Sequence, residues 1–380
     1  MSGGVDSSVS ALLLKNQGYE VEGWYMKNWD QEDETGVAVC PEKEEYKDVE
    51  KVCKQLGIQC KKIPFEREYW NNVFTPCLNE YSQGLTPNPD VYCNREIKFK
   101  VFSELALQNA DYVATGHYCR LSRDSIIGQT KEIGQFPRLL KGLDSTKDQS
   151  YFLCEVPGHS FERVLFPVGS LPKKTVRQIA AENNLITAEK RDSFGICFIG
   201  ERNMNSFLSN YVTMKPGDIY SYKGDYMGKH NGLYNYTIGQ CIKQSGLKTN
   251  DKDMQRNRLI VSPSQHSSLY TYSLNILKSS FHWIDEKEPS DLIRYKSMNC
   301  DAVTRYRQNC ISCILSYDEQ SPNEYKVLFK SPVRAVTPGQ ICVLYYGDVC
   351  LGGGSIYKHG KSLYEEGIDI FINQKEISRN

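Results

Sequence analysis

The stretch SGGVDSS at residues 2–8 decides how the first half of the chain is organised. Two glycines lie beside hydroxyl side chains, and the run at residues 7–16 predicts a helix directly after them. The N–H groups and the dipole at a helix start favour an anion, and glycines let backbone approach phosphate closely. The stretch lacks the Gly-Lys-Ser/Thr of a Walker loop. It therefore predicts a phosphate loop of another class, with a simple helix cap as the alternative.

Strands and helices alternate on the C-terminal side of this loop. The hydrophobic pattern predicts strands at 20–27, 59–65 and 111–117, and helices at 44–56, 67–82, 96–108 and 173–183. This alternation is typical of an α/β fold with a parallel, doubly wound sheet. Because a loop of this kind follows a buried strand, we expect a further strand, and any targeting peptide, to precede residue 1.

The pattern changes in the second half of the chain. A helix at 203–212 precedes short runs such as GDIYSY and LYNYTIG, and almost every segment after residue 290 has the character of a strand. We therefore expect three domains: a catalytic domain at 1–202, a small central domain at 203–285 and a β-barrel at 286–380.

Composition indicates an ordinary globular protein. Its 380 residues suffice for two or three domains, and 46 basic residues balance 46 acidic ones, so a polyanion would need a local basic face. No apolar run reaches the roughly 20 residues that cross a bilayer, and no membrane partner is expected. The 14 cysteines in a chain with no recognisable signal peptide favour a reducing compartment and free thiols.

Two cysteines have neighbours that suit reactivity. Asp90 lies three residues before Cys93, and basic residues follow at what reads as a helix start, where a thiol has a lowered pKa. Asp90 is within local reach as a proton acceptor. Cys197, in RDSFGICFIGERN at 191–203, lies between glycines and arginines. Each cysteine could instead be a buried structural residue, and for Cys197 a strand in the core is the stronger alternative.

Resemblance to known proteins sharpens these hypotheses. SGGVDSS resembles the PP-loop of ATP pyrophosphatases, in which Asp6 would help to place Mg²⁺ beside ATP. Nine motifs occur in the order found in the tRNA-specific 2-thiouridylase family, which includes MnmA and mitochondrial TRMU: SGGVDSS, MKNWD (26–30), EYWNNVF (68–74), TPNPDVYCNREIKFK (86–100), ATGHY (114–118), KDQSYFL (147–153), GICFIGERN (195–203), YTIGQ (236–240) and AVTPGQ (335–340). The likeness spans nearly the whole chain. Two departures are the missing strand before the PP-loop and the altered segment at 241–257.

The resemblance implies roles for individual residues. The ATP site would be lined by Ser2, Gly3, Gly4, Val5, Asp6, Ser7, Ser8, Met26 and Gly116. The target uridine would meet Asn88, Pro89 and Asp90, and the remaining tRNA contacts would be His117, Lys147, Asp148, Gln149, Arg305, Tyr306 and Gln340. ATP would adenylate O2 of wobble uridine 34 in tRNA for Lys, Glu or Gln, and a Cys197 persulfide would deliver sulfur. Cys93 would then release the product, leaving a transient Cys93–Cys197 disulfide.

Several of these residues have simpler interpretations. His117 could be a packed histidine at a strand end, and the run at 147–149 could be a solvated turn. Arg305 and Tyr306 alternate on a predicted strand, so one of them could be plain surface. Cys310 and Cys313 form a CxxC, but residues three apart face opposite sides of a strand and no second pair completes a zinc site, so we expect no metal held by a protein cluster.

Two other functions compete with thiolation. Another PP-loop enzyme, such as a synthetase acting on a small carboxylate or nucleotide, would not need Cys93 and Cys197. An RNA-binding protein without catalysis would bind tRNA and not turn over ATP. For the thiolase, we expect a persulfide donor or relay protein as a partner. The richness in cysteine favours a mitochondrial location, with a bacterial cytoplasm as the alternative.

Overall fold

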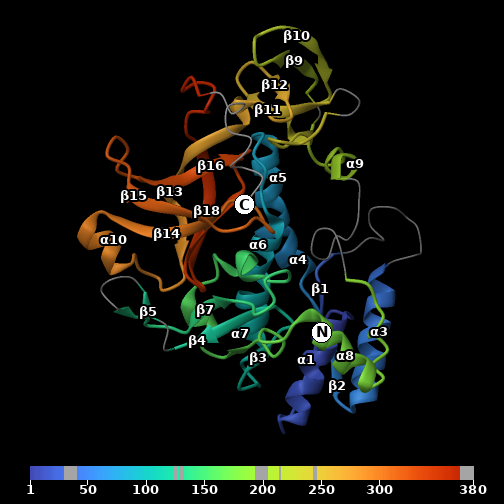
Figure 1. The fold of residues 1–380 in the computed structure, drawn as a ribbon. Helices are drawn as coiled ribbons and strands as arrows, with labels where there is room; N and C mark the ends of the chain where they lie inside the picture. Colours follow the sequence, from blue (N-terminus) through green and yellow to red (C-terminus); the bar gives the residue numbers. More distant parts are fainter. Residues whose placement is uncertain are drawn as a thin grey trace.

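The computed structural model describes residues 1–29, 41–123, 126–127, 132–192, 204–213, 215–242 and 246–368. Helix α1 (Val5–Asn16) starts directly at the glycine-rich stretch, with Gly4 as its N-cap. Gly18 lies two residues after the end of α1, and its φ of +89° is the left-handed conformation that favours glycine after a helix. The apolar side of α1 packs against helix α8 (Lys173–Glu182), and the two helices lie together in the lower part of Figure 1.

Two pairs of parallel strands flank α1. Strand β1 (Glu22–Lys27) runs parallel to β2 (Gln59–Pro64), and helix α3 (Pro41–Leu56) connects them. Strand β3 (Val113–Ala114) runs parallel to β8 (Val164–Leu165). The strands predicted at 20–27 and 59–65 and the helix predicted at 44–56 are therefore confirmed, whereas the strand predicted at 111–117 is limited to the two residues of β3. The parallel pairing is that of an α/β domain, but among the described residues it forms two separate two-stranded sheets and not the single sheet that was expected.

Two long helical segments follow β2. The first, predicted at 67–82, comprises α4 (Glu66–Tyr69), the π-helical η1 (Trp70–Phe74) and α5 (Thr75–Ser82). The second comprises α6 (Pro89–Tyr92), the π-helical η2 (Cys93–Val101) and α7 (Phe102–Ala106). Its predicted start at residue 96 is wrong, because Pro89 occupies the first helical position and the Asn88 side chain accepts a hydrogen bond from Val91 N–H.

A hairpin connects the α/β part to the C-terminal barrel. Strands β4 (Cys119–Ser122) and β7 (Arg138–Lys141) pair antiparallel around the small β5 (Ile126–Ile127) and β6 (Glu132–Ile133). Leu140 of β7 also pairs with Val349 of the barrel. The 3₁₀ turns η3 (Ser150–Leu153) and η4 (Gly158–Phe161) lead on to β8.

The central part is a small four-stranded sheet, drawn at the top of Figure 1. After α9 (Met204–Leu208), its strands lie in the order β10-β9-β12-β11. Their bounds are β9 (Gly217–Ser221), β10 (Tyr226–His230), β11 (Leu247–Asp253) and β12 (Arg258–Pro263). The run LYNYTIG is not a strand: it contains the 3₁₀ turn η5 (Leu233–Asn235), whose Leu233 packs on buried Leu259 and Val261.

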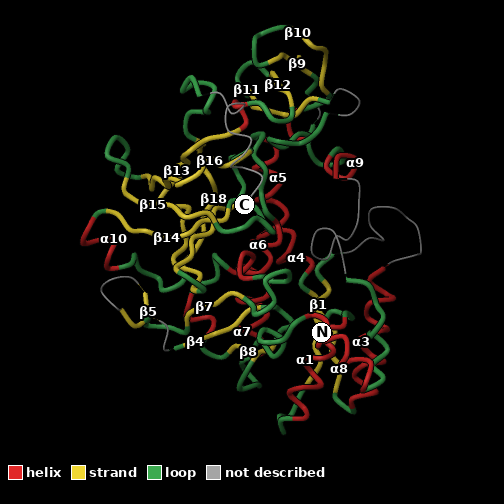
Figure 2. Tube along the Cα trace, viewed as in Figure 1, coloured by secondary structure: helices red, strands yellow, loops and turns green. Residues whose placement is uncertain are grey.

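The predicted C-terminal barrel is confirmed. Six antiparallel strands lie in the order β13-β16-β15-β14-β17-β18, and β13 pairs with β18 to close the ring, visible as yellow strands in Figure 2. Their bounds, with the short helices between them, are η6 (Ser267–Leu269), β13 (Tyr270–Trp283), α10 (Ser290–Tyr295), β14 (Ser297–Val303), β15 (Ile311–Tyr317), β16 (Glu324–Arg334), β17 (Ile341–Tyr346) and β18 (Val349–His359). Strand β13 begins ahead of residue 286, and the division into three domains stays a prediction. No helix in the described ranges is long and apolar enough to span a membrane.

Candidate active site

The glycine-rich loop is shaped by close backbone approaches. Gly3 has a φ of +72°, and a Cβ there would lie 2.7 Å from the carbonyl oxygen of Glu45, so only glycine fits. The Ser7 and Ser8 hydroxyls donate to the Gly4 carbonyl oxygen, at 3.1 and 2.9 Å. The first N–H groups of α1 have no partner within the helix, by helix geometry. This arrangement suits a phosphate group.

The end of β3 meets this loop. A Cβ on Gly116 would lie 2.9 Å from both the Asp6 carbonyl carbon and the Ser7 nitrogen, so Gly116 allows close contact with the start of α1. Ligands in α/β sheets bind at the carboxyl ends of the strands. Met26, near the carboxyl end of β1, is half-buried and pairs with Ile63. The structure thus brings Gly116 against the loop, as the ATP-site hypothesis requires.

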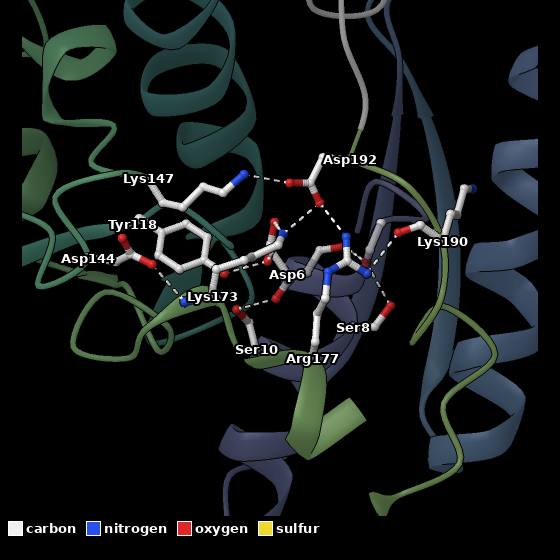
Figure 3. Close-up of polar contacts among 12 residues, drawn as sticks. Asp6, Ser8, Ser10, Tyr118, Asp144, Lys147, Lys173, Arg177, Lys190 and Asp192 are labelled. Carbon is white, nitrogen blue, oxygen red and sulfur yellow. Dashed lines mark hydrogen bonds and ion pairs between the residues drawn. The ribbon is translucent and has the colours of Figure 1, made fainter. Parts of the chain in front are cut away.

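Asp6 is already held by protein donors. Both of its carboxylate oxygens accept hydrogen bonds from Lys173 Nζ at 2.7 Å, and Oδ1 also accepts one from the Tyr118 hydroxyl at 2.7 Å (Figure 3). Lys173 therefore supplies the positive charge beside this carboxylate, and the arrangement does not fit a Mg²⁺ ion bound by Asp6. In the described part of the chain, no group of three or more His, Cys, Asp or Glu side chains could hold a metal ion.

The same lysine reaches a second carboxylate, Asp192. Its Oδ1 accepts from Lys173 Nζ and from Arg177 Nη2, both at 2.8 Å. Its Oδ2 accepts from Lys147 Nζ, also at 2.8 Å. Partial burial acts to raise the pKa of Asp192, but the hydrogen bonds from Lys147 and Lys173 outweigh it and lower that pKa to about 2. Asp192 is therefore ionised at neutral pH.

Cys93 lies inside a helix and not at its start, which corrects the expectation from the sequence. The helix begins at Pro89, and the Cys93 N–H bonds to the Asp90 and Pro89 carbonyls. The thiol is fully buried. Arg95 pairs with Glu155 and Glu96, and Lys100 pairs with Glu96, so these two cations are directed at carboxylates. The helix-start position that the sequence predicted for Cys93 is therefore wrong.

A loop of the barrel holds the segment before this helix. Gln340 Nε2 donates to the Thr86 carbonyl oxygen at 2.9 Å, and Thr86 N–H donates to the Pro338 carbonyl oxygen at 3.2 Å. A Cβ on Gly339 would lie 2.5 Å from the Thr86 nitrogen. The barrel thus fixes the backbone two residues before Asn88, although 254 residues separate Gln340 from Thr86.

Comparisons with known proteins agree with this geometry. Three family models match in succession: a tRNA methyl transferase HUP domain at 1–201, a tRNA methyl transferase PRC-barrel domain at 205–263 and an aminomethyltransferase beta-barrel domain at 273–356. The chain is 47% identical to the tRNA-specific 2-thiouridylase MnmA of Alkaliphilus oremlandii, with 94% of this chain and 95% of the relative covered. It belongs to the MnmA 2-thiouridylase family. Its identity to the MnmA proteins of Vibrio vulnificus and Bacillus subtilis is 47% and 46%, covering 95% and 96% of this chain and 96% of each relative.

Some of the residues predicted to contact tRNA are engaged in contacts within the protein, and His117 is the first of these. His117 is 9% exposed, contacts the rings of Phe99 and Phe166, and forms a hydrogen bond with the Thr115 hydroxyl through Nδ1. Burial lowers the pKa of His117 well below its usual value, so the ring is neutral. This is the packed histidine that the sequence left open as an alternative.

The run at 147–149 is a turn held by hydrogen bonds and an ion pair. Asp148 accepts hydrogen bonds from the Gly142 and Ser150 N–H groups, and the Gln149 side chain accepts one from Tyr118 N–H. Lys147 pairs with Asp192. The three side chains therefore shape the protein around the PP-loop, whatever they contact in RNA.

Arg305 and Tyr306 are not on a strand, contrary to expectation, because β14 ends at Val303 and a turn follows. Arg305 Nη2 donates to the carbonyls of Ile238 and Ala335 and to the Thr337 hydroxyl, at 2.6–2.8 Å. It thereby joins the central part to the barrel. Tyr306 is half-buried, with its ring centroid 4.4 Å from that of Phe152.

The remaining cysteine predictions have different outcomes. Cys197 lies outside the described residues. Cys310 is exposed and contacts Lys141 Nζ at 3.1 Å, whereas Cys313 is buried with its sulfur 3.5 Å from that of Cys300. The two thiols of the CxxC thus face different neighbours.

Sequence reasoning missed Lys173 and Asp192. The signal for Lys173 was available: it places a basic residue in the first turn of an amphipathic helix, where acidic residues are favoured, and such an exception indicates a carboxylate partner. Nothing in the pattern around Asp192 shows that three cations converge on it, because they come from two distant segments.

Proposed function

We propose that this protein is an ATP-dependent sulfurtransferase that converts wobble uridine 34 of tRNA for Lys, Glu or Gln into 2-thiouridine. The observation that carries the proposal is similarity to 2-thiouridylases along 94–96% of the chain, together with a phosphate loop and the Asn88–Cys93 helix in one folded unit. The rival synthetase hypothesis gives no reason for this helix or for the two domains after residue 203.

The chemistry proceeds in two stages. The uridine O2 attacks the α-phosphate of ATP, pyrophosphate leaves, and the poor leaving group at C2 becomes AMP. The outer sulfur of a Cys197 persulfide then attacks C2 and AMP departs. The Cys93 thiolate attacks the Cys197 sulfur, which frees 2-thiouridine and leaves a Cys93–Cys197 disulfide for an external dithiol to reduce. Asp90, on the same helix as Cys93, takes the thiol proton.

Residues of the phosphate loop and its surroundings support the binding steps. The α1 N-terminus receives the phosphates of ATP, with Gly116 allowing β3 to close one side. Any Mg²⁺ would be held by the phosphates of ATP, since Lys173 neutralises Asp6. Tyr306, the loop at 335–340 and Asn88 form the surface that we assign to tRNA.

A persulfide donor or relay protein completes the set of partners. The three relatives compared above are bacterial. We therefore favour a bacterial cytoplasm as the location, the alternative that the sequence left open, over a mitochondrion.

The test is a reconstituted reaction with tRNA for Lys, Glu or Gln, ATP, Mg²⁺ and a persulfide donor. Wild-type protein should form 2-thiouridine and AMP, and Cys197→Ser and Cys93→Ser should form no 2-thiouridine. Cys241→Ser serves as the matched control, because Cys241 is an exposed cysteine of the central part and should be dispensable. AMP release that needs no tRNA would favour the rival synthetase, and tRNA binding without AMP release would favour a plain RNA-binding protein.

A further inference from the structure

Ion pairs hold the chain just before the Cys197 segment. Asp192 lies five positions before Cys197 and is the last described residue before it. As Figure 3 shows, Lys147, Lys173 and Arg177 all direct their cationic groups to its carboxylate, each at 2.8 Å. Charge-assisted hydrogen bonds are about twice as strong as neutral ones, so three of them fix the position of this carboxylate.

Arg177 holds more of the same segment. Its Nη1 donates to the Ala188 carbonyl oxygen at 2.8 Å and to the Lys190 carbonyl oxygen at 3.0 Å. Lys190 in turn pairs with Asp48 of α3 at 2.7 Å. Residues 188–192 are therefore held to α8 and α3 at alternate positions, which fixes the chain as far as Asp192.

Lys173 connects this fastening to the phosphate loop. Its ammonium group bonds both oxygens of Asp6 and one oxygen of Asp192, and its side chain is only 10% exposed. A single buried cation thus joins the first turn of α1 to the residue that precedes the Cys197 segment. If one of these hydrogen bonds were lost and Asp192 moved, the point from which the chain continues to Cys197 would shift relative to the phosphate loop.

We propose that Asp192 is a positioning residue for sulfur transfer: by binding Lys147, Lys173 and Arg177 together, it sets the starting point of the Cys197 segment relative to the PP-loop. This inference rests on the proposed thiolation. Activation of uridine needs ATP and tRNA but no sulfur, whereas the second stage needs the persulfide at C2. If the sulfur is misplaced, water attacks the activated C2 and regenerates uridine with release of AMP.

The experiment compares the two stages in one reaction. Pyrophosphate release reports activation, and 2-thiouridine formed per pyrophosphate reports the coupling of sulfur transfer to activation. Asp192→Asn should keep tRNA-dependent pyrophosphate release within about twofold of wild type and lower the coupling ratio by roughly 10- to 100-fold, the usual effect of a misplaced reactant. Asp192→Glu retains the charge and should recover part of the ratio.

The matched control is Glu22→Gln. Glu22 pairs with Lys61 at 2.8 Å at the first residue of β1, away from the carboxyl ends of the strands, so both readouts should equal those of wild type. If Asp192→Asn does not fold, Arg177→Gln removes one of the three donors and should lower the same ratio. An unchanged ratio, or an equal fall in both readouts, would overturn the positioning role. Absence of 2-thiouridine with wild-type protein would instead reject the proposed function.

Discussion

Replacing Gly116 by alanine tests whether the end of β3 forms one wall of the nucleotide site. The added Cβ would lie 2.9 Å from the Asp6 carbonyl carbon and the Ser7 nitrogen, where ordinary contact begins at 3.4 Å. The backbone of one element must therefore retreat by about 0.5 Å, the difference between these two distances. Overpacking of this kind costs about 1 to 3 kcal/mol.

This strain falls on the phosphate loop, because the two atoms that the Cβ would touch belong to the first turn of α1. If the whole cost appears in binding, the Kd for a non-hydrolysable ATP analogue should rise by roughly 5- to 150-fold. Isothermal titration calorimetry measures this change, and thermal unfolding measures the accompanying loss of stability.

Gly18→Ala provides the control. It places a Cβ at a φ of +89° with nothing within 4 Å, at the other end of α1, so it should cost about 1 kcal/mol of stability and leave ATP affinity unchanged. The reasoning is refuted if Gly116→Ala binds the analogue within twofold of wild type, or if Gly18→Ala weakens binding as much.

Three further predictions concern stability. The pKa of Asp192 is lowered to about 2, so its contribution is present above the unfolded pKa of 3.8 and lost as pH falls toward 2. When the unfolding free energy is measured as pH is lowered from 4 to 2, it should fall by about 1 kcal/mol on account of Asp192, after allowance for solvent screening. Asp192→Asn should abolish this part of the pH dependence. Burial raises the pKa of Glu155 to about 7, although Arg95 opposes the shift. Its contribution is therefore present below pH 4.5 and lost as pH rises through 7, and the stability of wild type relative to Glu155→Gln should fall over that range by up to about 3 kcal/mol in urea unfolding. Arg305→Ala removes the donor to the Ile238 carbonyl and the Thr337 hydroxyl, whereas the Ala335 carbonyl keeps its hydrogen bond from the Thr337 hydroxyl. This change should cost about 2 kcal/mol of unfolding free energy in the same assay, and Arg307→Ala in the same turn should cost less than about 0.5 kcal/mol.

The sequence predicted the elements whose side chains repeat with a regular period. Helix α8 was expected at 173–183 and strand β2 at 59–65, and both occur within one residue of those bounds. The start of the Cys93 helix was misplaced because Asn-Pro-Asp was taken for a loop, although asparagine at the N-cap and proline at the first helical position are a helix start.

The candidate site was only partly predictable, for a physical reason. Gly3 could be assigned because glycine in a phosphate loop has a local backbone explanation, whereas Gly116 was assigned only through the resemblance to the 2-thiouridylase family. The partners of Asp6 and Asp192 could not, since Lys147 and Lys173 are brought to them by tertiary packing between distant segments. The structural role of Arg305 was missed for the same reason, because its acceptors lie more than 29 residues away along the chain.

The bond from Gln340 to Thr86 has a consequence for any attempt to dissect the protein into fragments. A fragment ending near residue 202 would retain α1, Lys173 and the parallel strands, but it would lose the Ile341, Val343 and Tyr345 side chains that pack in the same core. It would lose Gln340 and the Pro338 carbonyl, which leaves the Thr86 amide and carbonyl to water. The segment that enters the Cys93 helix would then lack these two hydrogen bonds, and such a fragment would misrepresent the substrate side of the enzyme.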